Sequence, residues 1–218
     1  MYMINIAIDG PAAAGKSTIA KRVATNLGYK YLDTGAMYRA ITLFFHENSD
    51  TDLNKLAELI DIEFSQEGKL FLNDKDVTDK IRESHITKSV SQVASLKEVR
   101  EFLVDLQRKI ASKKGYVLDG RDIGSVVLPD AELKVFMTAS PEVRAKRRLI
   151  EEHLRGNMIE LSTLIDEIIE RDTSDMTRDI SPLIQADDAV LVSTDELSID
   201  EVTNKIVELA NEKVTGEK

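Results

Sequence analysis

The segment MINIAIDGPAAAGKS at residues 3–17 decides the fold of this chain. Residues 3–8 are almost wholly apolar and partly β-branched, which is typical of a strand buried on both faces of a parallel sheet. From Ser17 onward the apolar residues recur at helical spacing, and Gly28 is placed to end that helix. A second strand is predicted over 29–32 and a second helix from 35 to about 46. This alternation of strand and helix predicts an α/β fold with a parallel core sheet.

Residues 10–17 match the pattern G-x-x-x-x-G-K-[ST] at every fixed position. Because a strand ends just before this pattern and a helix starts at its end, backbone N–H groups and the helix N-terminus would converge on one anion. We expect Lys16 to reach the β and γ phosphates of a nucleotide and the Ser17 hydroxyl to ligate Mg²⁺. The residues expected to bind the nucleotide in this loop are Gly10, Pro11, Ala12, Ala13, Ala14, Gly15, Lys16, Ser17 and Thr18.

The composition is that of one globular domain, with 218 residues of which 42% are hydrophobic and 31% charged. The absence of cysteine excludes disulfides and thiolate zinc sites. A formal net charge of −10 argues against a long nucleic acid as partner, because phosphate polymers are bound by excess Lys and Arg. No segment has the apolar length of a membrane span, and residues 1–10 lack the basic segment of a targeting signal. We expect a cytoplasmic protein that meets an anionic ligand with a local basic cluster, around Arg144 to Arg155.

Three later segments repeat the pattern of a core strand, at 116–119, 133–138 and 189–194. Before them, 62–65 and 70–73 predict a small antiparallel hairpin with a turn at 66–68, and 77–114 reads as helical. A hairpin and helices inserted into an α/β chain suggest a separate lobe that grips a substrate. A decorative insertion is the alternative at this point.

A helix is predicted to start at Ser140-Pro141-Glu142, with Ser140 as cap and proline in the first helical position. Gly156-Asn157 interrupts it, and apolar spacing resumes over 159–171. Two helices with a short break between them would make a hinged lid.

A carboxylate, Asp119, ends the apolar strand 116–119. Because the carboxyl ends of parallel strands line the ligand crevice, Asp119 would lie near the Mg²⁺ at Ser17 and could hold a metal-bound water. An ordinary Asp between a strand and a turn is the alternative. Asp33, at the end of the second strand, carries the same ambiguity.

Arginines recur at helical spacing in two places. Arg144, Arg147 and Arg148 fall on one helical face, where they could stabilise the charge that develops in phosphoryl transfer. The alternative is a solvated face on which Glu151 and Glu152 pair with the arginines, and for Lys146 and Arg148 taken singly we favour it.

The second arginine group consists of Arg171 and Arg178, with Asp175 between them at positions i, i+4 and i+7. The three residues share a face only if the helix that contains Arg171 continues. Because this group lies beside Ser181-Pro182, we favour a functional role for its arginines.

A phosphate loop indicates that a nucleotide binds, but it does not identify a second substrate. GTPases, transporters, motor ATPases and small-molecule kinases all have such a loop. The chain has no N-K-x-D guanine motif, no D-x-x-G switch and no adjacent glycines of a transporter signature. Small-molecule kinases and nucleotide-switched binding modules therefore remain.

Five motifs give the chain a close resemblance to the bacterial cytidylate kinases, a family of nucleoside monophosphate kinases. They span most of the sequence and are Ile8-Asp9-Gly10-Pro11, Leu32-Asp33-Thr34-Gly35-Ala36-Met37-Tyr38-Arg39, Ser91-Gln92-Val93-Ala94, Asp119-Gly120-Arg121-Asp122-Ile123-Gly124, and Arg171-Asp172 with Asp175, Arg178, Ser181 and Pro182. The resemblance implies a P-loop kinase with a five-stranded parallel core sheet in the order 2-3-1-4-5. It also implies a core at 1–36, 115–150 and 172–218, a monophosphate-binding insertion at 37–114, and a helical lid at 151–171.

The same resemblance implies that the protein transfers the γ-phosphoryl group of ATP to CMP or dCMP, with Mg²⁺ held by Ser17 and Asp119. Cytosine would be read by Ser91, Arg100 and Asp122, and the CMP phosphate held by Arg39, Arg121 and Arg171. Asp175 and Arg178 would bind the sugar, with Thr34 near the base and phosphate. Arg148 would contact ATP, and the residues implied in catalysis are Lys16, Arg121 and Arg171. The expected form is a monomer without nucleic acid or membrane partners.

Two positions depart from the family pattern. Ala13 stands where the family usually has glycine, which matters only if the position needs a positive φ angle, at a cost of about 1 kcal/mol or more. Thr34 replaces a serine of some members and keeps the hydroxyl. Outside this assignment, a kinase for UMP, AMP or shikimate and a non-enzymatic nucleotide-switched module remain the alternatives.

Overall fold

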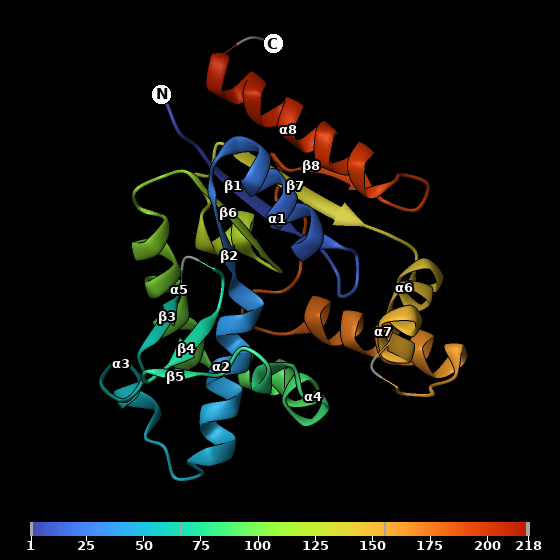
Figure 1. Cartoon of the computed structure of the whole chain (residues 1–218). Coiled ribbons are helices and arrows are strands. Elements are labelled where there is room, and N and C mark those ends of the chain that lie inside the picture. The colour runs from blue at the N-terminus through green and yellow to red at the C-terminus, as the bar shows by residue number, and fades with distance from the viewer. Residues whose placement is uncertain (1, 66, 155, 217–218) are drawn as a thin grey trace. The chain divides into compact units, whose positions relative to one another are not determined.

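The computed structural model describes residues 2–65, 67–154 and 156–216 (Figure 1). The chain forms two compact units. Unit 1 comprises Met1–Leu32 and Ala111–Lys218, and unit 2 comprises Asp33–Ile110. Each unit is described by itself below. Within the described residues, no helix combines the length and apolar composition that a membrane crossing requires.

A five-stranded sheet forms the centre of unit 1. Its strands are β1 (Asn5–Asp9), β2 (Lys30–Asp33), β6 (Tyr116–Gly120), β7 (Leu133–Thr138) and β8 (Val190–Ser193). The order is β2-β6-β1-β7-β8, which is the predicted order 2-3-1-4-5 when these five strands alone are counted. β1 pairs in parallel with β6 and β7, and β7 pairs in parallel with β8.

The register of the sheet places functional side chains at the carboxyl ends of two neighbouring strands. Asp9 is the last residue of β1 and Asp119 the last but one of β6, with Ile8 opposite Asp119 and Asp9 opposite Gly120. All five residues of β1 are buried, as the run of apolar residues predicted. Both carboxylates are therefore fixed by strands whose own positions are set by core packing.

Helices cover the sheet of unit 1. α1 (Lys16–Leu27) ends at Gly28, whose φ of 67° is left-handed, so the predicted glycine cap is confirmed. α8 (Ile199–Thr215) packs on α1 and starts with a capping box in which Ser198 and Glu201 bond reciprocally. Ile6, Val23 and Ile206 are among the residues of the shared core. This core anchors the N-terminal end of α1, where the phosphate loop ends.

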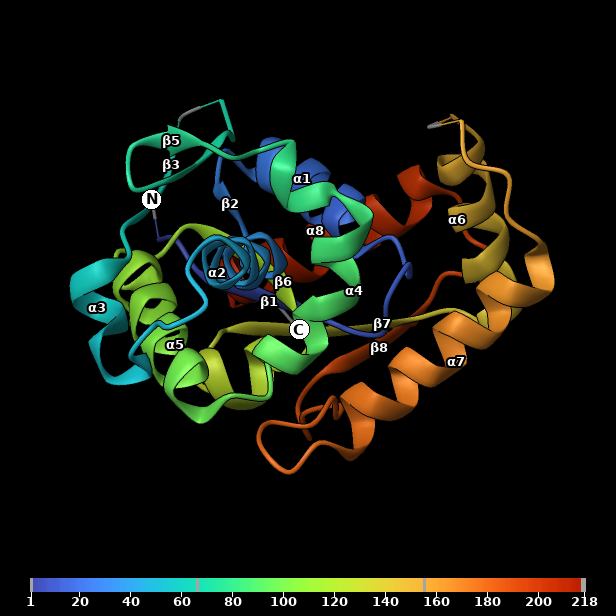
Figure 2. The ribbon, with the colours of Figure 1, turned by 90° about the horizontal axis from the view of Figure 1, so that it is seen from below.

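Two further helices of unit 1, α6 (Pro141–Leu154) and α7 (Leu161–Thr177), lie side by side (Figure 2). Ala145, Leu164 and Ile168 form a small core between them. The second helix was predicted over 159–171, so the prediction ends it about six residues too early. Of the predicted basic cluster, Arg155 lies outside the described residues.

Unit 2 contains a three-stranded antiparallel sheet, with β3 (Ile62–Phe64), β4 (Leu70–Leu72) and β5 (Lys75–Asp76). The predicted hairpin is confirmed as β3 and β4, while Gln66 of its predicted turn lies outside the described residues. β5 was missed because two exposed charged residues carry no strand pattern.

The helices of unit 2 begin with α2 (Thr34–Glu47) and the short η1 (Leu53–Lys55) and α3 (Leu56–Leu59). The stretch predicted as continuously helical breaks into η2 (Lys80–Arg82), α4 (Ser84–Val93) and α5 (Lys97–Ala111). The break follows α4, where the amides of Ser95 and Leu96 bond to carbonyls three residues back and the Ser95 hydroxyl donates to Gln92 O at 2.7 Å.

Candidate functional site

The phosphate loop of unit 1 joins β1 to α1 and has a backbone that requires special residues. Gly10 has a φ of 146°, and a Cβ there would lie 2.0 Å from the carbonyl oxygen of Met137 in β7. Gly15, the residue before α1, has a φ of 88°. The two fixed glycines of the motif therefore serve close strand packing at the start of the loop and a left-handed turn at its end.

Ala13 also lies in the left-handed region, with a φ of 58°. The replacement of the family's usual glycine by Ala13 therefore matters, because this position has a positive φ angle. An L residue with a Cβ costs roughly 1–2 kcal/mol in this region relative to glycine. The loop keeps its conformation although Ala13 opposes it.

Lys16 bends back over the loop, and its Nζ donates a hydrogen bond to the carbonyl oxygen of Pro11 at 2.7 Å. Burial and the nearby positive charge of Arg121 lower the pKa of Lys16 to about 7, although the carboxylates of Asp119 and Asp9 act in the opposite direction. A buried ammonium of this kind gains most from a phosphate placed beside it.

An oxygen-rich group lies at the start of α1. The Ser17 hydroxyl donates to Oδ2 of Asp119 at 2.8 Å, and the Tyr31 hydroxyl donates to Oδ1 of the same carboxylate at 2.7 Å. Ser17 and Asp119 are thus brought together, as the sequence predicted. Tyr31 was missed, and the only signal for it is its place in the strand that ends beside Asp119.

Hard oxygen ligands suit Mg²⁺, which typically takes one or two protein oxygens and completes its shell with water and substrate phosphates. The hydroxyl of Ser17 and the carboxylate of Asp119 fit that requirement. Among the described residues there is no group of three or more His, Asp or Glu side chains able to hold a metal alone. The donor set therefore fits a metal that is shared with a nucleotide.

Asp9 is a further buried carboxylate that the sequence analysis did not assign to the site. Its two oxygens accept hydrogen bonds from the backbone amides of Ile123 and Gly124, each at 2.7 Å. Burial raises the pKa of Asp9 to about 6, against the effect of these two bonds. Asp9 thus fixes the segment that follows Asp122, and its position before Gly10 in the family motif was the available signal.

A network of arginines and carboxylates connects the end of β6 with α7. Arg121 Nε donates to Asp175 Oδ2 at 2.8 Å, and Arg178 lies 3.9 Å from both Asp175 and Asp122. Arg178 also donates to the carbonyl oxygen of Ser181. Since α7 continues to Thr177, Arg171 and Asp175 share a helix as predicted.

Charge governs Asp175 in this network. Burial alone would raise its pKa, but the positive charges of Arg121, Arg171 and Arg178 hold the pKa of this carboxyl below its ordinary value. The carboxylate therefore stays ionised and keeps the guanidiniums in place. Four of the residues implied in acceptor binding, Arg121, Asp122, Asp175 and Arg178, are brought together in this way.

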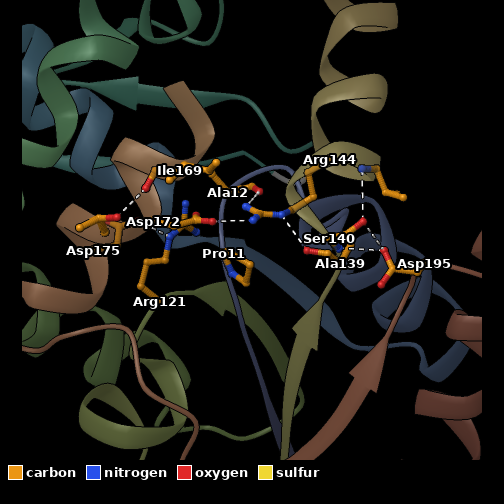
Figure 3. A network of polar contacts seen from close by, with 12 residues as sticks. Pro11, Ala12, Arg121, Ala139, Ser140, Arg144, Ile169, Asp172, Asp175 and Asp195 are labelled. Atoms are coloured by element: carbon orange, nitrogen blue, oxygen red, sulfur yellow. Dashed lines mark hydrogen bonds and ion pairs between the residues drawn. The ribbon is translucent and has the colours of Figure 1, made fainter. Parts of the chain in front are cut away.

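The three arginines of α6 have three different sets of partners, which neither the transition-state interpretation nor the solvated-face interpretation predicted. Arg144 is 3% exposed and donates to Ala12 O at 3.0 Å, Ala139 O at 2.9 Å and Asp172 Oδ2 at 2.5 Å (Figure 3). A side chain so completely engaged contacts protein groups, not an added anion.

Arg147 and Arg148 of α6 are half-buried. Arg147 donates to the Thr194 carbonyl at 2.6 Å and to the Ala14 carbonyl at 3.4 Å. Arg148 pairs with Glu167 of α7 at 3.5 Å, and Lys146 is exposed. Arg147 thus anchors a second carbonyl of the phosphate loop, whereas Arg148 pairs with α7.

The other implied acceptor residues belong to unit 2, where α2 starts with an organised turn. The Asp33 carboxylate caps α2 by accepting from the Ala36 amide at 2.7 Å and pairs with Arg39 at 3.2 Å. A Cβ on Gly35 would lie 3.1 Å from an Arg39 nitrogen, so glycine leaves room for this pair. The ambiguity at Asp33 is resolved in favour of a cap that also orients an arginine.

Arg100 of α5 is 3% exposed and bonds to the carbonyl oxygen of Ala94 at 3.3 Å. Its guanidinium lies over the ring of Tyr38 in α2, 5.6 Å from the ring centre. Thr34 is buried in the first turn of α2, and Ser91 is half-buried in α4. Unit 2 therefore carries Thr34, Arg39, Ser91 and Arg100 on three of its helices.

Comparison with known proteins gives one consistent result. The sequence model of the family described as cytidylate kinase matches residues 6–212. The chain is 51% identical over 218 residues to the cytidylate kinase of Exiguobacterium sibiricum, covering 96% of this chain and 98% of the relative. It is 49% identical to that of Lactobacillus johnsonii, covering 97% and 96%. Among solved structures, a shikimate kinase from Bacteroides thetaiotaomicron has a similar fold, with a TM-score of 0.50, 17% identity, and coverage of 96% of this chain and 99% of that one.

Proposed function

Because the chain belongs to the cytidylate kinase family, we propose that it transfers the γ-phosphoryl group of ATP to CMP or dCMP, giving ADP and CDP or dCDP. The observation that carries this function is that unit 1 combines a complete phosphate loop with a second cationic group. Arg121 and Arg178, fixed by Asp175, are separate from the loop's own Lys16 and suit a second anionic substrate.

The donor site is the phosphate loop. Backbone N–H groups of residues 12–18 bind the ATP phosphates, since Pro11 has no N–H to donate. The Lys16 ammonium leaves Pro11 O to neutralise the β and γ oxygens. Arg148, which is partly exposed on α6, contacts ATP. Burial makes these interactions stronger than they would be in water.

The Ser17 hydroxyl would ligate Mg²⁺, and the Asp119 carboxylate beside it would hold a metal-bound water. When bound, the ion neutralises charge on the β and γ phosphates. Tyr31 keeps the carboxylate of Asp119 oriented by its hydrogen bond to Oδ1.

The residues that we assign to the acceptor lie in the motifs of the family. Ser91, Arg100 and Asp122 read the cytosine edge. Arg39, Arg121 and Arg171 bind the phosphate, Asp175 and Arg178 bind the sugar, and Thr34 lies near the base and phosphate. The buried setting of Arg100 and Asp122 supports base reading, because hydrogen bonds to buried charged groups are stronger than those between neutral groups.

Phosphoryl transfer here needs no general base, because the acceptor is already a phosphate oxygen. The residues of the chain align the two nucleotides, neutralise charge through Lys16, Arg121 and Arg171, and exclude water. In this proposal residues 37–114 form the monophosphate-binding insertion, residues 151–171 form the lid, and the remainder is the core. We propose that the enzyme is cytoplasmic and monomeric. Light scattering on the purified protein tests the oligomeric state.

A coupled ADP-release assay with ATP and Mg²⁺ tests the function. CMP, dCMP, UMP, AMP, GMP and dTMP are offered one at a time, beside a blank without acceptor. We expect rapid release with CMP and dCMP, weak release with UMP and release near the blank with the others. Equal rates with all six would refute the cytosine assignment. If none of the six releases ADP faster than the blank, the class of acceptor is refuted. ATP binding would then still be tested separately by calorimetry.

A further inference from the structure

Arg144 is the most deeply buried arginine of α6 and has no part in the substrate or nucleotide binding proposed above. Its three bonds run in three directions, to the phosphate loop at Ala12, to the end of β7 at Ala139 and to α7 at Asp172 (Figure 3). Asp172 directly follows Arg171 and lies one turn before Asp175. One buried side chain therefore joins the donor loop to the helical turn that carries acceptor groups.

The carboxylate of Asp172 depends on this contact. It is 8% exposed, and its Oδ1 has no hydrogen-bond partner within the part of the chain that the structure describes. Oδ2 accepts from Arg144 at 2.5 Å. The orientation of this turn of α7 is thus set by a charge-assisted bond whose other end is fixed on the loop.

We propose that Arg144 is a positioning residue for phosphoryl transfer, a clamp that holds the Ala12 carbonyl of the phosphate loop and Asp172 of α7 in one geometry. This inference rests on the proposed function, because the clamp aligns the ATP bound by the loop with Arg171 and Asp175. It touches neither nucleotide. Its contribution is to alignment, which acts on the turnover rate more than on binding of ATP alone.

Only arginine suits this position. Its planar guanidinium presents donors in a rigid fork, so Nε and both terminal nitrogens reach separate acceptors. Lysine has a single flexible ammonium that cannot bridge the loop, the strand end and α7 in the same way. Arg144→Lys therefore keeps the charge and breaks the clamp.

A role in folding alone is the competing explanation, and the pair Arg144–Asp172 offers a way to separate the two. Removing one member of a buried ion pair leaves an unpaired charge, whereas replacing both by apolar residues is often neutral or stabilising. Arg144→Met combined with Asp172→Leu should therefore be more stable than Arg144→Met alone, which leaves Asp172 unpaired, although Ala12 O and Ala139 O still lose a donor. The unfolding temperature of each variant gives the folding readout.

The test measures kcat with CMP, ATP affinity by calorimetry without CMP, and unfolding temperature, for both variants. We expect kcat to fall about tenfold in Arg144→Lys and about a hundredfold in the double variant, while ATP affinity changes less than about threefold. A double variant with wild-type stability and wild-type kcat would overturn the proposal.

Two arginine variants serve as controls. Arg22→Lys alters an exposed ion pair with Asp200 in the same unit and should leave kcat unchanged. Arg147→Lys releases the Ala14 carbonyl without touching α7, and should weaken ATP binding with a smaller loss of kcat. An equal loss of kcat in Arg147→Lys and Arg144→Lys would mean that anchoring the loop suffices, and would refute the link to α7.

Hydrogen exchange of the Ala12, Ala13 and Ala14 amides separates this inference from the proposed function. Loss of the clamp should speed their exchange several-fold in both variants, even if the wild type proves to transfer no phosphoryl group to CMP. Inactivity of the wild type with CMP would reject the acceptor assignment alone. Unchanged exchange of these amides would reject the clamp alone.

Discussion

The phosphate loop and the α6–α7 pair both supply cationic groups to unit 1, but the sequence specifies them in different ways. In the loop, the positions of Gly10 and Lys16 follow from backbone angles and from the strand and helix on either side. In the helical pair, Arg144, Arg147 and Arg148 share one face of α6 but have unrelated partners. A motif built on backbone geometry can therefore be read locally, whereas a motif built on long side chains depends on what the fold brings to them.

The largest effect should come from Gly10→Ala, which tests the backbone half of this comparison. A Cβ at 2.0 Å from Met137 O forces the loop away from β7, and we expect a loss of stability on the order of 3 kcal/mol or more and no measurable ATP binding. Chemical unfolding and calorimetry provide the two readouts.

Gly28→Ala is the matched control for that change. Gly28 also has a positive φ angle, but a Cβ there would meet nothing within 4 Å. It should cost only the roughly 1–2 kcal/mol of the left-handed conformation and leave ATP binding intact. Equal losses at the two glycines would show that the φ angle, not the packing against β7, makes Gly10 necessary.

The second effect concerns the pH dependence of ATP binding. With a pKa near 7 in the free protein, Lys16 loses its proton as the pH rises above 7, and bound phosphates favour the protonated form. Affinity for ATP should therefore fall by up to about tenfold per pH unit from pH 7 to 9, with uptake of a proton on binding. Calorimetry in buffers of different ionisation enthalpy measures this uptake.

Lys16→Met supplies the comparison for the pH experiment. It should bind ATP weakly and with no pH dependence in this range, because the titrating group is gone. A wild-type affinity that stays constant from pH 7 to 9 would contradict the assignment of the titration to Lys16.

Much of the fold could be predicted from the sequence because its elements are marked locally. The five core strands are short apolar runs, and Gly28 and Pro141 mark helix ends by their own backbone preferences. β5 and the break after α4 could not be predicted in the same way. β5 is defined only by its pairing with β4, and the break only by local hydrogen bonds around Ser95, and neither has an apolar pattern or a Gly or Pro to mark it.

The same division holds for the site. The contact between Ser17 and Asp119 was predictable, since parallel strands bring their carboxyl ends to one edge. The roles of Tyr31, Asp9 and Arg144 were not, because no rule of sheet topology names their partners, which are the Asp119 carboxylate, the backbone amides of Ile123 and Gly124, and the Ala12 carbonyl. Whether Arg39, Ser91 and Arg100 read the substrate stays a prediction for the acceptor assay.

The third effect should come from Asp9→Asn, which alters a side chain that accepts hydrogen bonds from two backbone amides. Asparagine keeps one acceptor oxygen and turns an NH₂ group toward the other amide, so we expect a loss of about 1–3 kcal/mol at pH 7. Urea unfolding measures it.

The sign of the pH effect sharpens the test. Because the pKa of Asp9 is raised from 3.8 to about 6, the folded state holds more protons than the unfolded state between these values. The contribution of Asp9 to the free energy of unfolding is therefore greatest below pH 4 and declines toward pH 6. The stability difference between wild type and variant should shrink over this range, and a difference that grows would refute the raised pKa.

The smallest effect, and the one opposite in sign, should come from Ala13→Gly. Ala13 has a φ of 58° in a loop whose conformation is imposed by Gly10, Lys16 and the anchoring arginines, so glycine should relieve about 1 kcal/mol. Ala14→Gly is the neighbouring control, because Ala14 is not among the described residues with positive φ and should lose roughly 0.5–1 kcal/mol instead. Opposite shifts of the unfolding midpoint at these adjacent alanines would show that backbone angle, not side-chain contact, governs the loop. Shifts of the same sign would show that contacts with the rest of the fold, and not its backbone angle, determine the effect of Ala13. In that respect Ala13 would resemble the arginines of α6.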